Sequence, residues 1–176
     1  MPDWHAYVSQ FPMTPYGGAF LTGMGVCIIV GAFLQGSRQS LVWVGFALGI
    51  LLIVLSGRLL AKGLHSPTTF QLVALAAAIV FEFVALIVVM PRIRPKGERA
   101  VVSATMGIVG LHFLIMIPAF GFLIGLMALG CTLNAAALAT LSRYALGVAW
   151  FVDGVVKLTL GLAMLATSPV FYAASR

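Results

Sequence analysis

The sequence predicts an all-α fold, a polytopic transmembrane helical bundle of six helices that forms a single transmembrane domain over residues 1–176. Two observations lead to this prediction. Hydrophobic residues make up 62% of the chain and charged residues only 8%, whereas an ordinary soluble domain contains about 25% charged residues. The charges also gather between apolar runs of about 17 to 24 residues, near the roughly 20 that cross a hydrocarbon core.

Each predicted span ends where polar or turn-forming residues interrupt the apolar sequence. The first three breaks fall at 35–40, 56–67 and 91–99, and the last of these is strongly hydrophilic. Proline, glycine and charged residues in such breaks disfavour the continuation of a membrane helix. The predicted spans cover residues 17–34, 41–61, 69–90, 101–118, 121–141 and 144–167.

The segment 101–141 requires a turn of its own. It contains no Asp, Glu, Lys or Arg, and about 40 residues at about 1.5 Å each are too long for one helix across a core of roughly 30 Å. Pro118 and Gly121 bracket the natural turn of a helical hairpin, because both residue types disrupt a helix. A single kinked helix or a re-entrant segment is the alternative, and it would reduce the count to five spans.

Small residues predict helix contacts. Gly45 with Gly49 and Gly121 with Gly125 have four-residue spacing, which allows two helix backbones to approach closely. Both cysteines fall inside predicted spans, where a thiol behaves as a small hydrophobic group. We therefore expect packing faces at the glycines and no disulfide.

The distribution of basic residues predicts the orientation. The breaks after the first, third and fifth spans hold Arg38, Arg92, Arg94, Lys96, Arg99 and Arg143, whereas the opposite side holds Arg58, Lys62 and Arg176. Because cytoplasmic loops carry an excess of Lys and Arg, the first side is predicted to be cytoplasmic and both termini non-cytoplasmic. Residues 1–16 lack Lys and Arg but contain several aromatic residues, which predicts a lead-in segment at the membrane surface.

Composition also limits the partners and the chemistry. The net charge of +6 does not indicate nucleic acid, because the basic residues flank the spans and form no stripe with interleaved aromatic residues. The expected partner is the lipid bilayer, whose anionic head groups would meet the basic breaks; a homo-oligomer or a larger membrane complex is left open. No metal or cofactor site and no catalytic residue is predicted, since no His-Glu-x-x-His, Cys-x-x-Cys or phosphate-binding glycine motif occurs.

Four ionisable residues, Glu82, His112, Asp153 and Lys157, interrupt otherwise apolar spans. Such groups are costly in hydrocarbon, normally face the bundle interior and are candidate functional residues. At about 1.5 Å per residue from the predicted cytoplasmic ends, they lie roughly 12 to 19 Å deep. We therefore predict one midplane polar cluster that binds a ligand or a proton, with Asn134 of the fifth span as a further contributor closer to the cytoplasmic end.

Each of these residues also has a structural interpretation. Asp153 and Lys157 are four apart on one helix face, so a salt bridge between them would neutralise both charges without any further role. Glu82 has no cation within a turn of its own helix, so it needs a partner from another helix or a proton of its own. His112 is either a proton relay, because imidazole titrates near neutrality, or a hydrogen-bonded core histidine.

The segment 110–118, Gly-Leu-His-Phe-Leu-Ile-Met-Ile-Pro, resembles a Gly-x-His-Phe-hydrophobic-Pro stretch in small bacterial inner-membrane proteins of unknown function. The likeness covers the middle part of the chain. It implies a location in the bacterial inner (plasma) membrane and draws attention to His112 and Pro118. It implies no mechanism.

Together these observations favour a small membrane protein that binds or carries a small polar or amphipathic solute at the midplane cluster, with transport linked to protonation of Glu82 or His112. The first alternative is an accessory or assembly subunit of a larger membrane complex, whose buried charges only hold helices together. The second alternative is a membrane enzyme acting on lipid, with Glu82 and His112 as base and acid. Of these interpretations, the carrier is preferred to the enzyme.

Overall fold

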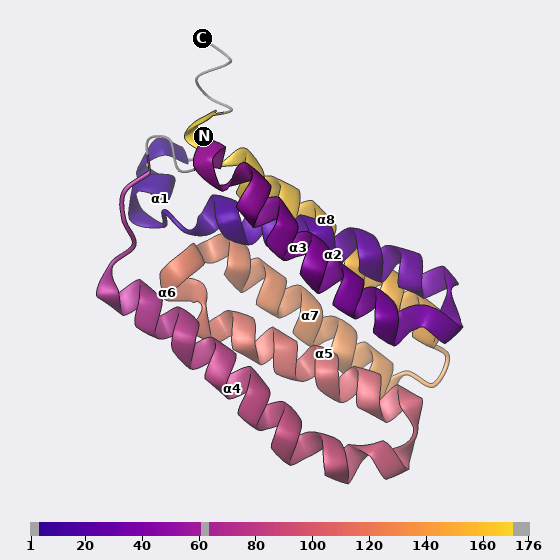
Figure 1. The fold of residues 1–176 in the computed structure, drawn as a ribbon. Helices are drawn as coiled ribbons and strands as arrows, with labels where there is room; N and C mark the ends of the chain where they lie inside the picture. Colours follow the sequence, from indigo (N-terminus) through magenta and orange to yellow (C-terminus); the bar gives the residue numbers. More distant parts are fainter. Residues whose placement is uncertain (1–3, 61–63, 171–176) are drawn as a thin grey trace.

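The structure, a computed structural model, describes residues 4–60 and 64–170 of the chain (Figure 1). The helices are α1 (Trp4–Gln10), α2 (Thr14–Phe33), η1 (Gln35–Ser37), α3 (Arg38–Leu60), α4 (Thr69–Ile93), η2 (Arg94–Lys96), α5 (Glu98–Ile115), α6 (Ile117–Phe120), α7 (Phe122–Thr140) and α8 (Leu146–Ala166). In the described residues, six helices are long and apolar enough to cross a membrane: α2, α3, α4 with η2, α5, α7 and α8. The chain is therefore a multi-pass membrane protein with an all-α fold.

The prediction of six spans is confirmed, including the hairpin within 101–141. α5 ends at Ile115, α6 forms a single turn, and Gly121 separates α6 from α7. Gly121 has a φ of +74°, a left-handed conformation that glycine adopts without the steric cost of a Cβ atom. Gly121 is thus a turn residue, and a Cβ atom there would lie 2.5 Å from the hydroxyl oxygen of Tyr7, so its close contact is with the N-terminal segment and not with another span.

α4 extends beyond its predicted end. The sequence places its end at residue 90, but the helix continues through Pro91 to Ile93 and is followed by η2. Proline removes one backbone donor and crowds the preceding turn, and the helix ends two residues after it. Gly97, with a φ of +93°, ends η2. At the other end of α4, Thr68 and Gln71 form a capping box that satisfies two backbone donors.

The long helices do not pack in chain order. α8 packs along α2, and α2 also packs on α3; α7 packs on both α5 and α8, and α5 packs on α4. The order in space is therefore α3, α2, α8, α7, α5, α4. Figure 1 shows α2, α3 and α8 as one group and α4, α5 and α7 as another, and the contact of α8 with α7 joins them.

Glycines set the closest of these helix contacts, between α2 and α8. A Cβ atom added to Gly25 would lie 2.5 Å from the backbone nitrogen of Leu158, and one added to Gly161 would lie 2.8 Å from that of Thr22. Gly154 is equally close to the backbone of α2. Only residues without a side chain permit such an approach, which increases dispersion contact where lipid provides no hydrophobic driving force.

A second glycine contact joins α2 to α3. A Cβ atom added to Gly23 would lie 2.8 Å from the backbone nitrogen of Gly49, and one added to Gly45 would lie 3.0 Å from Cβ of Cys27. The packing face expected from the spacing of Gly45 and Gly49 is therefore confirmed, and its partner is the first span.

The N-terminal segment folds over the turn between α6 and α7. The hydroxyl groups of Tyr7 and Thr14 both donate to the carbonyl of Phe120, at 2.7 and 3.1 Å. The side-chain amide of Gln71, at the start of α4, donates to the backbone carbonyl of Gln10 at 2.7 Å. The predicted lead-in segment is thus the short helix α1, and the first span begins at Thr14 instead of residue 17.

The close contact between α2 and α8 predicts that a methyl group added at one of its glycines lowers the stability of the protein. Gly25→Ala and Gly161→Ala should each destabilise the protein by about 1–3 kcal/mol, because the new Cβ atom overlaps backbone atoms that cannot move aside. Denaturant unfolding in detergent micelles, followed by circular dichroism, measures this loss.

Gly57→Ala is the matched control, since nothing lies within 4 Å of a Cβ atom at Gly57 in α3. This change should leave stability unchanged or slightly raised, as alanine favours a helix over glycine. Equal stability of the Gly25, Gly161 and Gly57 variants would show that α2 and α8 are not in backbone contact.

Candidate functional site

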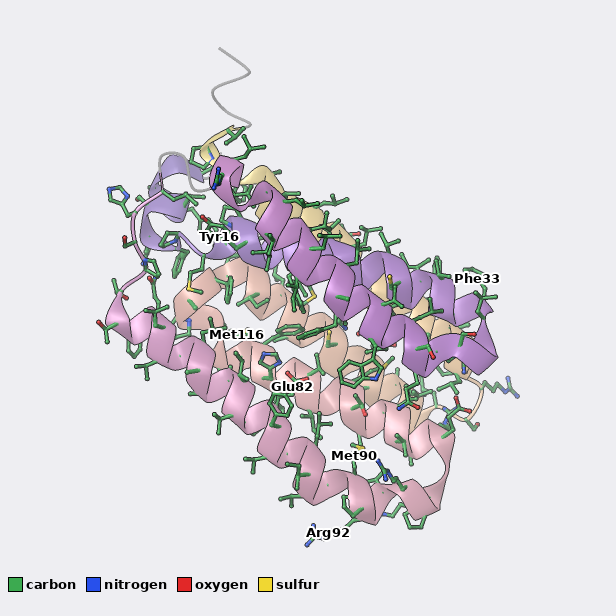
Figure 2. All side chains as sticks on the ribbon, in the orientation of Figure 1. Tyr16, Phe33, Glu82, Met90, Arg92 and Met116 are labelled. Atoms are coloured by element: carbon green, nitrogen blue, oxygen red, sulfur yellow. The ribbon has the colours of Figure 1, made fainter. Side chains whose placement is uncertain are left out.

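Glu82 finds its partner on the neighbouring helix. Oε2 of Glu82, on α4, lies 2.8 Å from Nδ1 of His112, on α5. Figure 2 shows Glu82 on the side of α4 that faces α5, whereas Arg92, at the end of the same helix, points outward. The partner expected from another helix is therefore a histidine, which carries a positive charge only when it is protonated.

The two side chains of this pair differ in exposure. The Glu82 side chain is 29% exposed and that of His112 is 9% exposed. The imidazole also lies against the ring of Phe113, with 4.9 Å between ring centroids. Neither ring nitrogen of His112 makes a hydrogen bond, so the 2.8 Å contact lacks an aligned N–H and is an ion pair only when the imidazole is protonated. Nε2 is left buried without a polar partner.

Asp153 and Lys157 form the salt bridge expected from their spacing. Nζ of Lys157 lies 2.5 Å from Oδ1 of Asp153, and both side chains are 6% exposed. The thiol of Cys131, on α7, lies 3.5 Å from the same carboxylate oxygen and 3.6 Å from Nζ. The pair therefore faces α7 and is enclosed by it.

Asn134 lies at the same contact between α7 and α8 and forms hydrogen bonds with Ala149 and Tyr144. Its amide donates to the carbonyl of Ala149 at 2.8 Å and accepts a hydrogen bond from the hydroxyl of Tyr144 at 2.6 Å. Burial raises the pKa of the Tyr144 phenol and the Asp153 carboxylate raises it further, so the phenol stays protonated and donates. Asn134 thus links α7 to the start of α8.

The candidate residues therefore form two groups. Cys131 and Asn134 are three apart on α7, which places them on one helix face, and that face meets the Asp153–Lys157 pair and the start of α8. Glu82 and His112 lie between α4 and α5. No hydrogen bond or ion pair within residues 4–60 and 64–170 connects the two groups.

Arg38, the basic residue of the first break, is part of the fold. Arg38 is buried; its Nε donates to the carbonyl of Gly31 at 3.2 Å, and its Nη1 lies 3.2 Å from Oε1 of Glu98. Its guanidinium also lies 5.8 Å from the centroid of Trp150, within cation–π range. Arg38 thereby joins the ends of α2, α5 and α8.

Arg99 makes a similar connection. Its guanidinium donates to the carbonyl groups of Tyr144 and Leu141, at 2.8 and 2.5 Å, in the connection between α7 and α8. With the contact between Arg38 and Glu98, this places the breaks after the first, third and fifth spans at one end of the bundle. We call this the basic end, defined by Arg38, Arg92, Arg94, Lys96, Arg99 and Arg143.

A cavity of about 320 Å³ lies away from the Glu82–His112 and Asp153–Lys157 pairs. It is lined by α2, α3 and the end of α8, through residues such as Thr22, Leu52 and Leu165, and its walls are almost wholly apolar. The hydroxyl of Thr22 is already bonded to the carbonyl of Gly18 in its own helix. The cavity therefore offers apolar surface and no charged group.

Comparison with known proteins identifies the family of the chain. Residues 5–171 match DUF6609, a family of unknown function. The chain belongs to this family. No curated protein and no solved structure matches it. DUF6609 membership agrees with the expected resemblance to uncharacterised proteins, and it assigns no activity.

Sequence reasoning missed three contributors to the polar interior of this DUF6609 protein: Cys131, Tyr144 and Arg38. Cys131 has a detectable signal, because it lies three residues before Asn134 and therefore on the same helix face. Tyr144 and Arg38 lie near predicted span ends, where an aromatic or basic residue is already explained by the membrane interface. Nothing in the sequence indicates that Arg38 is buried.

Because Asp153 and Lys157 are enclosed in this DUF6609 protein, we expect its stability to depend on both charges being present. Asp153→Leu or Lys157→Met alone should each cost about 3–5 kcal/mol of stability, because the remaining charge is left buried without a partner. The double variant should recover most of this loss. Denaturant unfolding of the three variants in detergent measures the coupling, and single variants as stable as the double variant would contradict a buried ion pair.

Proposed function

We propose that this protein is a small proton-linked carrier of the bacterial inner membrane, in which Glu82 and His112 bind and release the proton. The carried molecule is a small polar or amphipathic solute. The observation that supports this proposal is the half-open pair itself: a membrane carboxylate that is 29% exposed lies 2.8 Å from a buried histidine, and Nε2 of that histidine has no polar partner.

The chemistry of such a pair suits a proton site. Glu82 and His112 are neutral as a unit in two forms, with the proton on the imidazole or on the carboxyl group. Loss of that proton leaves one net negative charge among apolar helices, which is costly in hydrocarbon. The unprotonated pair therefore requires another proton or another cation, and this requirement couples proton release to the uptake of a second species.

The Asp153–Lys157 pair has a different role in this proposal. Both side chains are enclosed, and each already holds a full opposite charge at 2.5 Å. Exchange of a proton or solute there would first require α7 and α8 to separate. We therefore assign this pair to holding α8 against α7, together with Asn134, and assign the exchange to Glu82 and His112.

A lipid-soluble carbodiimide tests whether Glu82 is a protonated, accessible carboxyl group. Dicyclohexylcarbodiimide adds to protonated carboxyl groups and leaves a stable acylurea. We expect labelling of Glu82 that falls as the pH is raised, because the reagent requires the proton, and no labelling of Asp153, which is enclosed and paired. Peptide mass spectrometry after labelling in liposomes locates the adduct.

Glu82→Gln should lose the adduct, whereas Glu98→Gln, at the basic end, should retain it. Solvent-exposed Glu98 is the matched acidic control, since its partner Arg38 is permanently charged. Labelling of Asp153 in preference to Glu82, or labelling of Glu82 that does not depend on pH, would exclude this pair as the proton site.

The orientation in the membrane is a further part of this proposal. We place the basic end in the cytoplasm and both termini outside, because the excess of Lys and Arg favours the cytoplasmic side and the three basic breaks share one end.

A C-terminal fusion tests this orientation in bacteria. Alkaline phosphatase joined to the C-terminus should be active, because it folds only outside the cytoplasm, whereas green fluorescent protein at the same place should be dark. The same two reporters inserted after Lys96 should give the opposite result. Fluorescence of the C-terminal fusion would reverse the assignment.

A further inference from the structure

We propose that the solute is a lipophilic organic cation, and that it takes the place of the proton at Glu82. This inference rests on the proposed function and names the class of its substrate. Its basis is the identity of the groups around Glu82: a carboxylate in a membrane helix that is partly open, with a single titratable partner and apolar surroundings.

The elements packed on α4 hold few charges that face Glu82. α4 packs on α5, α6 and η2. α5 contributes His112 at the level of Glu82, its other ionisable residues being Glu98 and Arg99 at the basic end. α6 has no ionisable residue, and η2 carries its cations at the far end of α4. Within the described residues, the only cation that meets Glu82 is therefore a protonated His112.

This arrangement differs from that of the other buried acid. Asp153 has a lysine at 2.5 Å, and its side chain is 6% exposed, so a ligand cation would have to displace a fixed charge from an enclosed site. Glu82 has a partner that loses its charge when it loses its proton, and 29% of its side chain is uncovered. Of the two, Glu82 alone is accessible to a new cation and lacks a permanent one.

The route to Glu82 selects for lipophilicity. The surface of α4 on either side of Glu82 is apolar and exposed, with Val80 and Phe83 more than half uncovered. A small hydrated ion would lose its water on this surface without compensation. A cation whose charge is spread or shielded by apolar groups loses little hydration free energy on this surface.

The charge of the basic end also favours entry to Glu82 from the bilayer. Its six basic residues, of which Arg38 is paired with Glu98, leave an excess of positive charge that disfavours cations approaching from that side. A lipophilic cation that is already dissolved in the bilayer reaches α4 from the side and avoids this end. An anionic solute has no comparable site at Glu82, because its charge would meet a carboxylate.

The exchange conserves charge and forms no covalent bond. Before exchange, the Glu82–His112 pair holds one proton and is neutral. When the organic cation binds to the Glu82 carboxylate, the proton leaves to water and His112 stays neutral, so the occupied site is again neutral. One proton is therefore released for each cation bound, which is the stoichiometry of an exchanger.

Tetraphenylphosphonium and tetraphenylborate provide the test, because they have the same size and shape and opposite charge. Purified full-length protein in detergent is titrated with each ion by calorimetry, and protons released into weakly buffered solution are followed with a pH dye. We expect tetraphenylphosphonium to bind more tightly as the pH rises and to release about one proton per protein. Tetraphenylborate should release none.

Two independent changes at Glu82 give the controls. Glu82→Gln should weaken phosphonium binding by about tenfold or more and abolish proton release, while Glu98→Gln should behave as the wild type. Wild-type protein pretreated with dicyclohexylcarbodiimide should match Glu82→Gln, which covers the case in which that variant does not fold.

Three results would overturn the inference: no binding of tetraphenylphosphonium, equal binding of tetraphenylborate, or binding that Glu82→Gln leaves unchanged. Each would show that organic cations only dissolve in the apolar surface or do not interact at all. The proposed proton site would survive any of these results if carbodiimide still labelled Glu82 in a pH-dependent manner. Loss of that labelling as well would remove both proposals.

Discussion

Hydrocarbon offers no hydrogen-bonding partner, and the polar side chains of this protein are arranged around that constraint. Hydroxyl groups within the spans return to carbonyls of their own helix, as Thr22 does to Gly18 and Thr140 does to Ala136, each at 2.8 Å. Asn134 uses both ends of its amide to connect α7 with the start of α8. Among the acidic residues that the structure describes, Asp153 is the buried one, and a lysine one turn away neutralises it. The apolar bundle therefore tolerates these groups because each has a partner within reach.

In the part of the chain that the structure describes, a few buried polar atoms lack a hydrogen bond, and they differ in chemistry. Nε1 of Trp150, Oγ of Ser168 and the ring nitrogens of His112 are buried without a hydrogen bond. Indole and hydroxyl groups stay neutral, so each of these atoms costs the desolvation penalty of an uncharged polar group. His112 can gain or lose a charge beside a carboxylate. Since a titratable group is costly to leave half satisfied in a membrane, this pair is where we place the activity.

α8 shows how one helix serves two purposes. Its glycines, Gly154 and Gly161, face α2 and allow backbone contact, while Asp153 and Lys157 face α7. Neighbouring residues on a helix point about 100° apart, so one sequence can present a close-packing face and a polar face to different partners. Through these two faces α8 joins the group of α2, α3 and α8 to the group of α4, α5 and α7. The first span, α2, therefore packs directly on the last span, α8.

The six spans and the turn at Gly121 could be predicted from the sequence alone, because hydropathy, chain length and helix-breaking residues act locally. The Asp153–Lys157 pair could be predicted as well, since four-residue spacing on a helix fixes their proximity. Folding was needed to show that His112 is the partner of Glu82, that Arg38 is buried against Glu98, and that α8 lies between α2 and α7. These contacts depend on the rotation and order of whole helices, which are set by packing between distant segments and leave no local pattern in the chain.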